Sequence, residues 1–219
     1  MAKRIIDISV CISPDMPICP GDPIPSFKGS SSIVHDGFAV SKISMGTHTG
    51  THIDAPSHII EGGASINTIA LDNFYGKALV LDLGDLNRVI SGNVVESHLE
   101  RVAAHEKEKA AILLLKTSCS ESLSMDSETQ RSNIFFDGTL GQWFVNSGFK
   151  TVGIDMLSID PEYDHALPNH HLLLKNNICI IENLDLNGVE EGIYEFVCLP
   201  LKLVGCDASP ARAILIEEY

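Results

Sequence analysis

The chain has 219 residues, 44% of them hydrophobic, and carries a formal net charge of −14 with an isoelectric point near 4.9. So acidic a chain argues against a nucleic-acid or anionic-membrane partner, because both are usually contacted through clustered Lys and Arg. The length suits a single domain spanning residues 1–219, and no linker or internal repeat divides it.

The first half of the chain alternates strand-like runs with a turn-rich segment. Residues 13–25 (SPDMPICPGDPIP) combine prolines with turn formers, which predicts an ordered loop that could border an active site. Residues 94–105 carry an apolar stripe at helical spacing and are predicted to form an amphipathic helix capped by Asn93. Strands are predicted at residues 4–10, 38–45, 78–83 and 111–117.

Strand-like runs also dominate the second half. Residues 139–146 are predicted to form a helix that stops at Gly148 and carries the only tryptophan, Trp143, which we assign to packing. Continuous apolar runs such as AILLL and ICII indicate strands buried on both faces, as in a sheet covered by helices. The pattern predicts an α/β fold, rich in strands and with few helices. The strands are predicted at residues 151–154, 178–182, 194–204 and 213–217.

The N-terminal segment and the cysteines indicate the compartment. The apolar run in MAKRIIDISV is short and interrupted by Asp7, unlike the core of a signal peptide, and no segment is long enough to span a bilayer. Six cysteines lie far apart without a CxxC pair, several of them in apolar runs where reduced cysteine is commonly buried. We therefore expect reduced thiols and a cytoplasmic location.

The most informative segment is residues 45–58, MGTHTGTHIDAPSH. It holds His48, His52, Asp54 and His58, and imidazole with carboxylate suits zinc, manganese or iron in a catalytic site with a position open for water or substrate. All four lie at even positions, which share one face of an extended strand, and Pro56 with the neighbouring glycines disfavours a helix. Scattered surface or core histidines are the alternative, but they are unusual at this density. The segment is predicted to be a strand end entering a metal-binding loop.

A second cluster lies in residues 165–184, HALPNHHLLLKNNICIIENL. It offers His165, His170, His171 and Glu182. Glu182 follows an apolar strand, where an ionisable group must reach solvent or be compensated, and a metal would compensate it. Capping of a strand end or pairing with Lys175 or Lys202 remains the alternative for Glu182.

Together these residues carry a resemblance. HTGTHIDAPSH resembles the HxxxHxDxPxH signature of the cyclase-like metal-dependent hydrolases, which include bacterial kynurenine formamidase and isatin hydrolase. The similarity extends through PGD, GIDMLSIDP, the HH before IIENL, and LPLKLVGCDASPARAIL. It implies a compact swivelling β/β/α fold in one domain. It also implies a homodimer or higher homo-oligomer in which the neighbouring subunit helps to enclose the pocket.

The resemblance also implies a role for each site residue. His48, His52 and Asp54 bind one metal, Asp54 also reaches a second, and His170 with Glu182 completes the pair. His58 is the implied proton-transfer residue. Zinc is the first choice, as one or two ions, and manganese suits the same ligands. No GxSxG elbow or glycine-rich phosphate motif occurs, so neither a serine nucleophile nor a nucleotide cofactor is indicated.

The implied activity is hydrolysis of a small amide C–N bond, in an N-formyl arylamine such as N-formylkynurenine or in an isatin-like cyclic amide. A divalent metal would activate water for attack on the carbonyl. The formamidases resemble one another in a tryptophan directly before PGD, where this chain has Cys19, so the small-molecule substrate is less defined than the reaction class. Two alternatives remain: a hydrolase or cyclase acting on another carbonyl compound, such as an imide or lactone, and a metal-binding homologue without turnover.

Overall fold

The computed structural model describes residues 3–84, 89–102, 110–122, 134–161 and 163–218. Its strands are β1 Lys3–Asp7, β2 Ser26–Ser31, β3 Val40–Ser44, β4 His52–Asp54, β5 Tyr75–Asp82, β6 Val89–Ile90, β7 Ile112–Lys116, β8 Phe135–Phe136, β9 Thr151–Ile154, β10 Cys179–Glu182, β11 Gly192–Pro200 and β12 Ala208–Glu218. Its helices are α1 Ile33–Asp36, α2 Gly92–Leu99, α4 Cys119–Ser122, α6 Thr139–Ser147 and α7 Pro168–Lys175, with 3-10 turns η1 Pro56–His58, η2 Ile66–Thr68 and η3 Leu71–Asn73. Within these ranges, no helix is long and apolar enough to cross a membrane.

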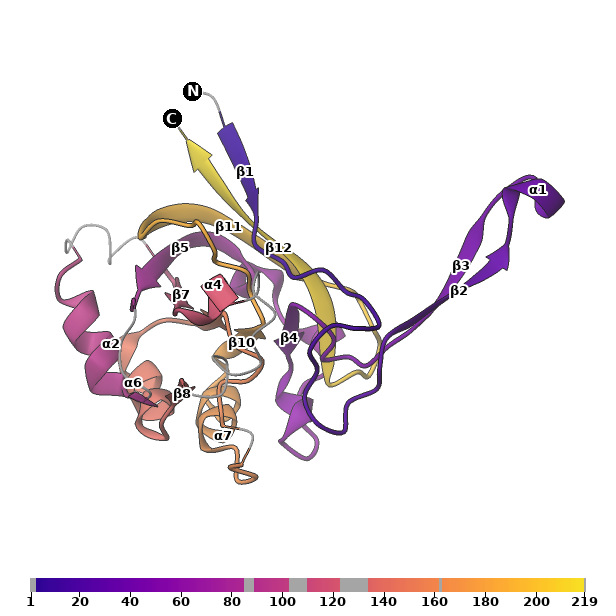
Figure 1. Ribbon diagram of the computed structural model, residues 1–219. Coiled ribbons are helices and arrows are strands. Elements are labelled where there is room, and N and C mark those ends of the chain that lie inside the picture. Colours follow the sequence, from indigo (N-terminus) through magenta and orange to yellow (C-terminus); the bar gives the residue numbers. More distant parts are fainter. Residues whose placement is uncertain (1–2, 85–88, 103–109, 123–133, 162, 219) are drawn as a thin grey trace.

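The main sheet closes on itself. Its order is β1-β12-β11-β5-β7-β9-β10-β4, and β4 pairs in addition with β12, which closes the strands from β12 to β4 into a ring and leaves β1 beside the C-terminal half of β12 (Figure 1). Strands β5, β7, β9 and β10 run parallel, whereas β4, β11 and β12 pair antiparallel with their neighbours. The short strand β4 is therefore the seam of the barrel. Helices α2, α6 and α7 cover one side of the sheet, and the two termini lie close together.

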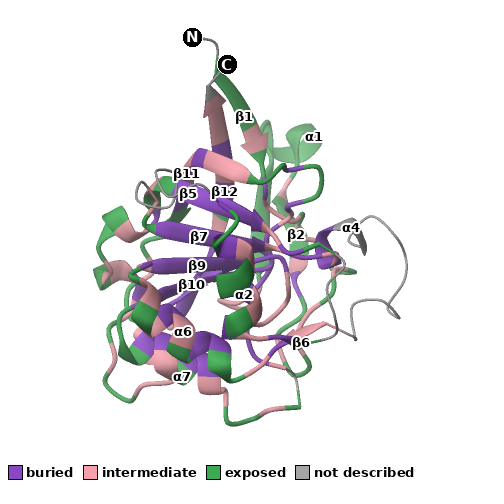
Figure 2. Ribbon diagram, turned by 90° about the vertical axis from the view of Figure 1, so that its left-hand side faces the viewer, coloured by how far each residue is buried: buried purple, intermediate pink, exposed green. Residues whose placement is uncertain are grey.

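Two apolar cores lie on opposite faces of the parallel strands, because successive side chains of a strand point to opposite faces. Leu79, Leu113 and Val152 belong to the core that packs under the helices. Val80 and Leu114 belong to the core inside the barrel. Figure 2 shows β7, β9 and β10 buried along most of their length, next to α6 and α7. The predicted strand-rich α/β fold, with strands buried on both faces, is confirmed.

The two predicted helices are present, with two corrections to the bounds of α2. Helix α6 ends at Gly148, which adopts the left-handed conformation expected of a helix stop. Helix α2 begins earlier than predicted, because Ser91, not Asn93, is its cap and accepts a hydrogen bond from the Val94 backbone N–H at 3.3 Å. The predicted extension of this helix is wrong at residues 100–102, which form a turn, and residues 103–105 lie outside the described residues.

Strand positions are largely as predicted, and the bounds shift most at the ends of the sheet. The 151–154 strand matches β9, whereas residues 201–204, predicted as strand, lie in a loop and turn. Strand β12 begins five residues earlier than expected, because residues 208–210 pair with β4. Helix α7 and strand β2 were not predicted. The proline-rich residues 13–25 form a loop with turns, as expected.

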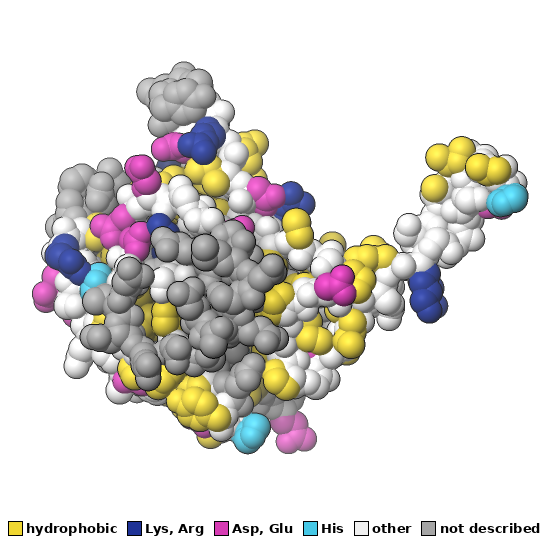
Figure 3. Space-filling view, viewed as in Figure 1, with side chains coloured by type: hydrophobic (Ala, Val, Ile, Leu, Met, Phe, Trp, Pro, Cys, Tyr) yellow, Lys and Arg dark blue, Asp and Glu magenta, His cyan; other side chains and the backbone are white. Residues whose placement is uncertain are grey.

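A two-stranded arm projects from the barrel. Among the described strands, β2 and β3 pair only with each other, and α1 closes the tip (Figure 1). Most residues of β2 and all of β3 are exposed, and apolar side chains gather at the tip in Figure 3. The exposed large apolar residues of the arm are Phe27, Ile33, Val34, Phe38, Val40 and Ile43.

Asp155, which follows β9, is a buried carboxyl outside the histidine clusters. The backbone N–H and hydroxyl groups of Thr117 and Ser120 donate four hydrogen bonds to it at 2.7–3.3 Å. Burial raises the pKa of Asp155 to about 6, although the bonds from Ser120 and Thr117 act to lower it. Such a group contributes stability below its unfolded pKa, and this contribution is lost as the pH rises through the folded value.

The pH dependence of stability provides a test of this burial. Relative to the non-titrating Asp155→Asn variant, the wild-type free energy of unfolding is expected to rise by on the order of 1 kcal/mol from pH 7 to pH 5. Urea denaturation of both proteins at the two pH values measures this difference. An unchanged difference would mean that Asp155 does not titrate in this range.

Candidate metal centre

The seam strand β4 and its neighbour β10 place three of the predicted ligands. In the antiparallel register, His52 lies opposite Glu182 and Asp54 lies opposite Ile180. Ile53 points the other way, into the barrel core. Because alternate residues share a face, His52, Asp54 and Glu182 project together on the side of the sheet that bears the helices. All three are buried.

His48 approaches from the turn that precedes β4, not from the strand itself. The turn contains Gly50, with φ of +68°, and a Cβ there would meet Ile12 at 2.9 Å, so glycine is required by both conformation and space. His58 lies beyond β4, in η1, which begins at Pro56. The segment is a strand end entering a loop, as predicted, and only His52 and Asp54 are on β4. The turn and η1 fold the outer two back toward them.

His170 comes from the first turn of α7. Asp160 accepts hydrogen bonds from the backbone N–H groups of Asn169 and His170, both at 3.0 Å, and so caps the start of this helix. It also contacts the ring Nδ1 of His170 at 2.7 Å. His165 and His171, the other histidines of the second cluster, are exposed. Of the three histidines in that cluster, His170 is the one that reaches the site.

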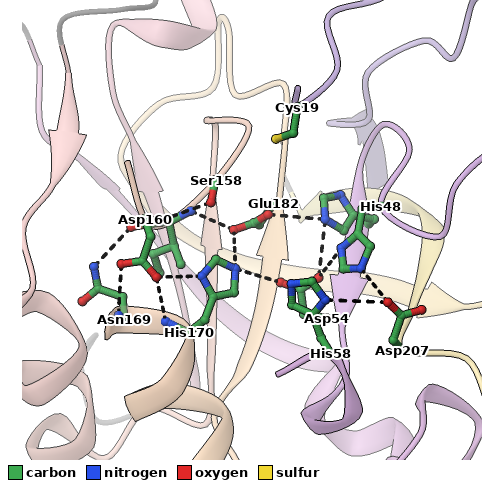
Figure 4. Close-up of polar contacts among 12 residues, drawn as sticks. Cys19, His48, Asp54, His58, Ser158, Asp160, Asn169, His170, Glu182 and Asp207 are labelled. Carbon is green, nitrogen blue, oxygen red and sulfur yellow. Dashed lines mark hydrogen bonds and ion pairs between the residues drawn. The ribbon is translucent and has the colours of Figure 1, made fainter. Parts of the chain in front are cut away.

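Five of the predicted site residues form two ligand groups that meet at Asp54 (Figure 4). Its Oδ1 lies 2.9 Å from His48 Nδ1 and 3.5 Å from His52 Nε2. Its Oδ2 lies 3.4 Å from His170 Nε2, which is also 3.4 Å from Glu182 Oε1. Potential ligand atoms within each group lie within 4.8 Å of one another. One carboxylate is thus placed between two groups, each able to hold an ion.

The donor set fits a divalent metal. Among the described residues, both Asp54 oxygens and His52 Nε2 are buried without a partner in hydrogen-bonding geometry. Buried polar atoms normally have hydrogen-bond partners. These three have none, and all of them belong to residues of the two ligand groups. Cations in the two groups would satisfy these lone pairs, and imidazole with carboxylate is the ligand chemistry of zinc and related metals.

The electrostatics agree with this fit. Burial lowers the pKa of His48, His52 and His170, but neighbouring carboxylates outweigh it and raise all three above the ordinary value, that of His48 to about 9. Burial raises the pKa of Asp54 and Glu182, yet the neighbouring histidines outweigh burial and keep the pKa of both carboxyls below its ordinary value. Protonated imidazoles therefore supply the positive charge that a cation would bring, and metal binding would release these protons.

The outer nitrogen of each candidate histidine ligand is held by an oxygen. His52 Nδ1 contacts the Gly50 carbonyl at 2.8 Å, His170 Nδ1 contacts Asp160, and His48 Nε2 contacts Asp207 at 3.1 Å. Such contacts fix the tautomer and aim the other nitrogen at the metal. Asp160 and Asp207 were not predicted, although both lie in the family-like segments SIDP and GCDASPAR.

His58 belongs to neither group that contains Asp54. Its ring lies 4.2 Å from that of His48 and 5.7 Å from that of His170, measured between centroids. Burial lowers the pKa of His58, although Asp54 acts to raise it. The ring is therefore neutral at pH 7 and stands beside the ligand groups with a nitrogen able to accept a proton.

The proline-rich loop presents Cys19 to the same region. Cys19, Pro20, Gly21 and Asp22 form a turn in which the Asp22 N–H donates to the Cys19 carbonyl at 3.1 Å and Gly21 has φ of +97°. The Cys19 thiol donates to the Leu157 carbonyl at 3.9 Å, two residues before Ile159, whose N–H donates to Glu182; Figure 4 draws this thiol above Glu182. The loop therefore borders the site.

Two alternatives from the sequence are decided by the contacts. Glu182 pairs with His52 and His170, at 3.3 and 3.4 Å, and not with Lys175 or Lys202. Trp143 packs against Phe144 and Phe149 and donates to Glu96 on α2, so its assignment to packing is confirmed.

The family model described as "Putative cyclase" matches residues 6–161. The chain belongs to this cyclase family. Among curated cyclase-family relatives, kynurenine formamidase of Salinibacter ruber is 34% identical over 213 residues, covering 96% of both chains. That of Bordetella pertussis is 34% identical over 216 residues, covering 98% of this chain and 99% of the relative.

Solved structures of the family have the same fold. A predicted metal-dependent hydrolase from Bacillus stearothermophilus is 33% identical, covers both chains completely and superposes with a TM-score of 0.81. Isatin hydrolase A from Labrenzia aggregata, at 22% identity, covers 98% of this chain and 93% of its own with a TM-score of 0.80, a likeness of fold. The predicted compact cyclase-like fold and the recognition of this family are confirmed.

Proposed function

We propose that this protein cleaves the C–N bond of a small amide, an N-formyl arylamine such as N-formylkynurenine or an isatin-like cyclic amide. Its class is that of a metal-dependent amide hydrolase, in keeping with full-length relatives named kynurenine formamidase. The observation that carries the proposal is Asp54, buried between two ligand groups with neither oxygen hydrogen-bonded among the described residues.

The side chains of the site have two roles, metal binding and proton transfer. When bound, a divalent metal would polarise the substrate carbonyl and lower the pKa of a water molecule. The residues that would hold the metal are His48, His52, Asp54, His170 and Glu182, and the second contacts of the histidines fix their orientation. His58 accepts a proton from the attacking water and returns it to the departing nitrogen, which is the role of a general base followed by a general acid.

We propose zinc as the native metal. Three imidazoles and two carboxylates suit it, and one or two ions can be held because Asp54 is shared. Manganese suits the same ligands, so metal content and activity have to be compared for both ions.

The loop at Cys19 affects the choice of substrate. Cys19 borders the site where the formamidase pattern has tryptophan, so an aryl ring lacks a stacking partner at this position. The assay therefore extends from N-formylkynurenine and isatin to non-aromatic amides, imides and lactones.

Metal-free protein reconstituted separately with zinc and with manganese tests the proposal. We expect turnover of at least one amide to appear with metal and to disappear with chelator. Hydrolysis that survives chelation would exclude a metal-dependent mechanism. Stoichiometric metal without turnover on the whole panel would instead identify a metal-binding homologue that has lost activity.

We also propose a homodimer or higher homo-oligomer assembled through the arm. An isolated two-stranded hairpin is marginally stable, and the arm exposes apolar residues such as Val34, which is 89% exposed. Covering them with a second copy of the chain would stabilise the arm.

The buried thiols of Cys179 and Cys198 suit a reducing, cytoplasmic location.

Charged substitutions at the tip test this assembly. Val34→Glu with Phe38→Glu is expected to convert the oligomer to a monomer, because burying two carboxylates in an apolar contact costs several kcal/mol. Light scattering after size-exclusion chromatography measures the mass. Leu71→Glu is the matched control, since Leu71 is an exposed apolar residue on η3 of the barrel body. A wild-type monomer, or an oligomer that persists in the double variant, would contradict the proposal.

A further inference from the structure

Asp207 stands at the rim of the site, between two histidines of different function. Its Oδ1 accepts a hydrogen bond from the Thr47 hydroxyl at 3.0 Å. Its Oδ2 lies 3.1 Å from His48 Nε2 and 3.6 Å from His58 Nδ1 (Figure 4). One carboxylate oxygen thus faces both a candidate ligand and the candidate proton-transfer residue.

The seam of the barrel fixes the position of Asp207. The Ala55 N–H donates to the Asp207 carbonyl at 2.8 Å, and the next residue, Ala208, pairs with Asp54 across β12 and β4. The same strand pair therefore places Asp54 at the centre of the ligand groups and Asp207 at their edge. This placement distinguishes Asp207 from a solvated surface carboxylate, although its side chain is 44% exposed.

The contact with His48 selects which nitrogen is available to a metal. His48 Nδ1 lies 2.9 Å from Asp54 Oδ1, on the inside of the site, while Nε2 faces Asp207. A carboxylate that accepts from the outer N–H keeps the proton there and leaves the inner nitrogen free to bind. Asp160 stands in the same relation to His170.

The contact with His58 has the corresponding effect on proton transfer. A proton held on Nδ1 by the carboxylate leaves the Nε2 lone pair available, which is how an aspartate orients a catalytic histidine. The distance of 3.6 Å is longer than a hydrogen bond, and catalytic contacts of this kind often tighten only when substrate is bound.

We propose that Asp207 is a positioning residue that orients His48 for metal binding and His58 for proton transfer. The second half of this inference rests on the proposed function. A proton of the attacking water moves to His58 Nε2 as the water oxygen bonds to the carbonyl carbon. The same proton moves to the departing nitrogen as the C–N bond breaks, and Asp207 stays ionised throughout.

Asp207→Asn, alone and in the His58→Ala background, separates the two effects. We expect the single variant to lose about 10- to 100-fold in kcat with little change in KM, and about 10-fold or more in zinc affinity. In the His58→Ala background, the effect on kcat should fall below about twofold while the loss of zinc affinity persists. Asp72→Asn, at an exposed carboxylate on η3, is the matched control.

A readout independent of turnover keeps the two proposals distinguishable. The ¹⁵N shifts of His58 in metal-free protein are expected to report the Nδ1–H tautomer in the wild type and a mixture in Asp207→Asn. Unchanged His58 shifts, or an equal loss of kcat in both backgrounds, would overturn the role toward His58. Unchanged zinc affinity would overturn the role toward His48. If no substrate is turned over, the proposed function fails, and the shifts and zinc affinity still decide the positioning role.

Discussion

Asp54→Asn is expected to reduce metal affinity by more than about 100-fold and to abolish metal-dependent hydrolysis. Asp54 is the only residue that belongs to both ligand groups centred on the β4 seam, so its loss weakens both, whereas replacing an outer carboxylate typically costs 10- to 100-fold. The amide is isosteric with the carboxylate but carries no charge for a cation. Calorimetric titration with zinc, together with metal content after gel filtration, measures the effect.

The same variant reveals how far metal binding stabilises the fold. Zinc should raise the melting temperature of the wild type, because a ligand that binds only the folded state stabilises it, and this shift should disappear in Asp54→Asn. Asp72→Asn should keep both the shift and the affinity. Retention of near-wild-type zinc affinity by Asp54→Asn would refute a centre built around this carboxylate.

The ligand-bearing segments could be recognised from the sequence because their signal is local. His48, His52 and Asp54 occur within seven residues, too densely for scattered surface groups, and Glu182 directly follows a buried apolar run. The structure brings all of them together. The strand end entering a loop was also predicted, but the spacing did not show that β4 has three residues or that a turn with Gly50 returns His48 to the site.

The supporting residues depend on contacts that are remote in the chain. Helix α7 has no cap from its own preceding residues, because Leu167 adopts a left-handed conformation and Asp160 provides the acceptor from farther upstream. Its eight residues also give a weak periodic signal. Asp207 meets His48 across 159 positions. No local pattern specifies such a pair. The one sequence signal for Asp207 was its place in a segment that carries the family resemblance.

Strands of the sheet were predicted where burial gives them an apolar composition. They were missed where pairing with neighbouring strands, and not composition, determines them. Strands β7 and β9 are apolar on both faces and were located within one residue. Residues 208–212 include Pro210, which argues against a strand, yet they extend β12 because β4 and β11 pair with them. Strand β2, SFKGSS, has little apolar character, and β3 is its one partner in the described part of the chain.

His58→Ala is expected to lower kcat by about 10²- to 10⁴-fold while leaving zinc affinity within about threefold of the wild type. The ring lies outside both groups that contain Asp54 and could hold an ion only in a third group, with His48 and Asp207, so its removal takes away a proton carrier and no ligand of the two Asp54 groups. Steady-state kinetics on the best substrate of the panel, with metal content determined for the same samples, measures both quantities.

His171→Ala is the matched control, because this histidine adjoins His170 on α7 but is exposed, so it should retain wild-type kinetics. A large loss of zinc from His58→Ala would make His58 a ligand and require another base. Full activity with full metal content would show that solvent carries the proton. Loss of turnover with retained metal is expected only if His58 moves the proton between the attacking water and the departing nitrogen.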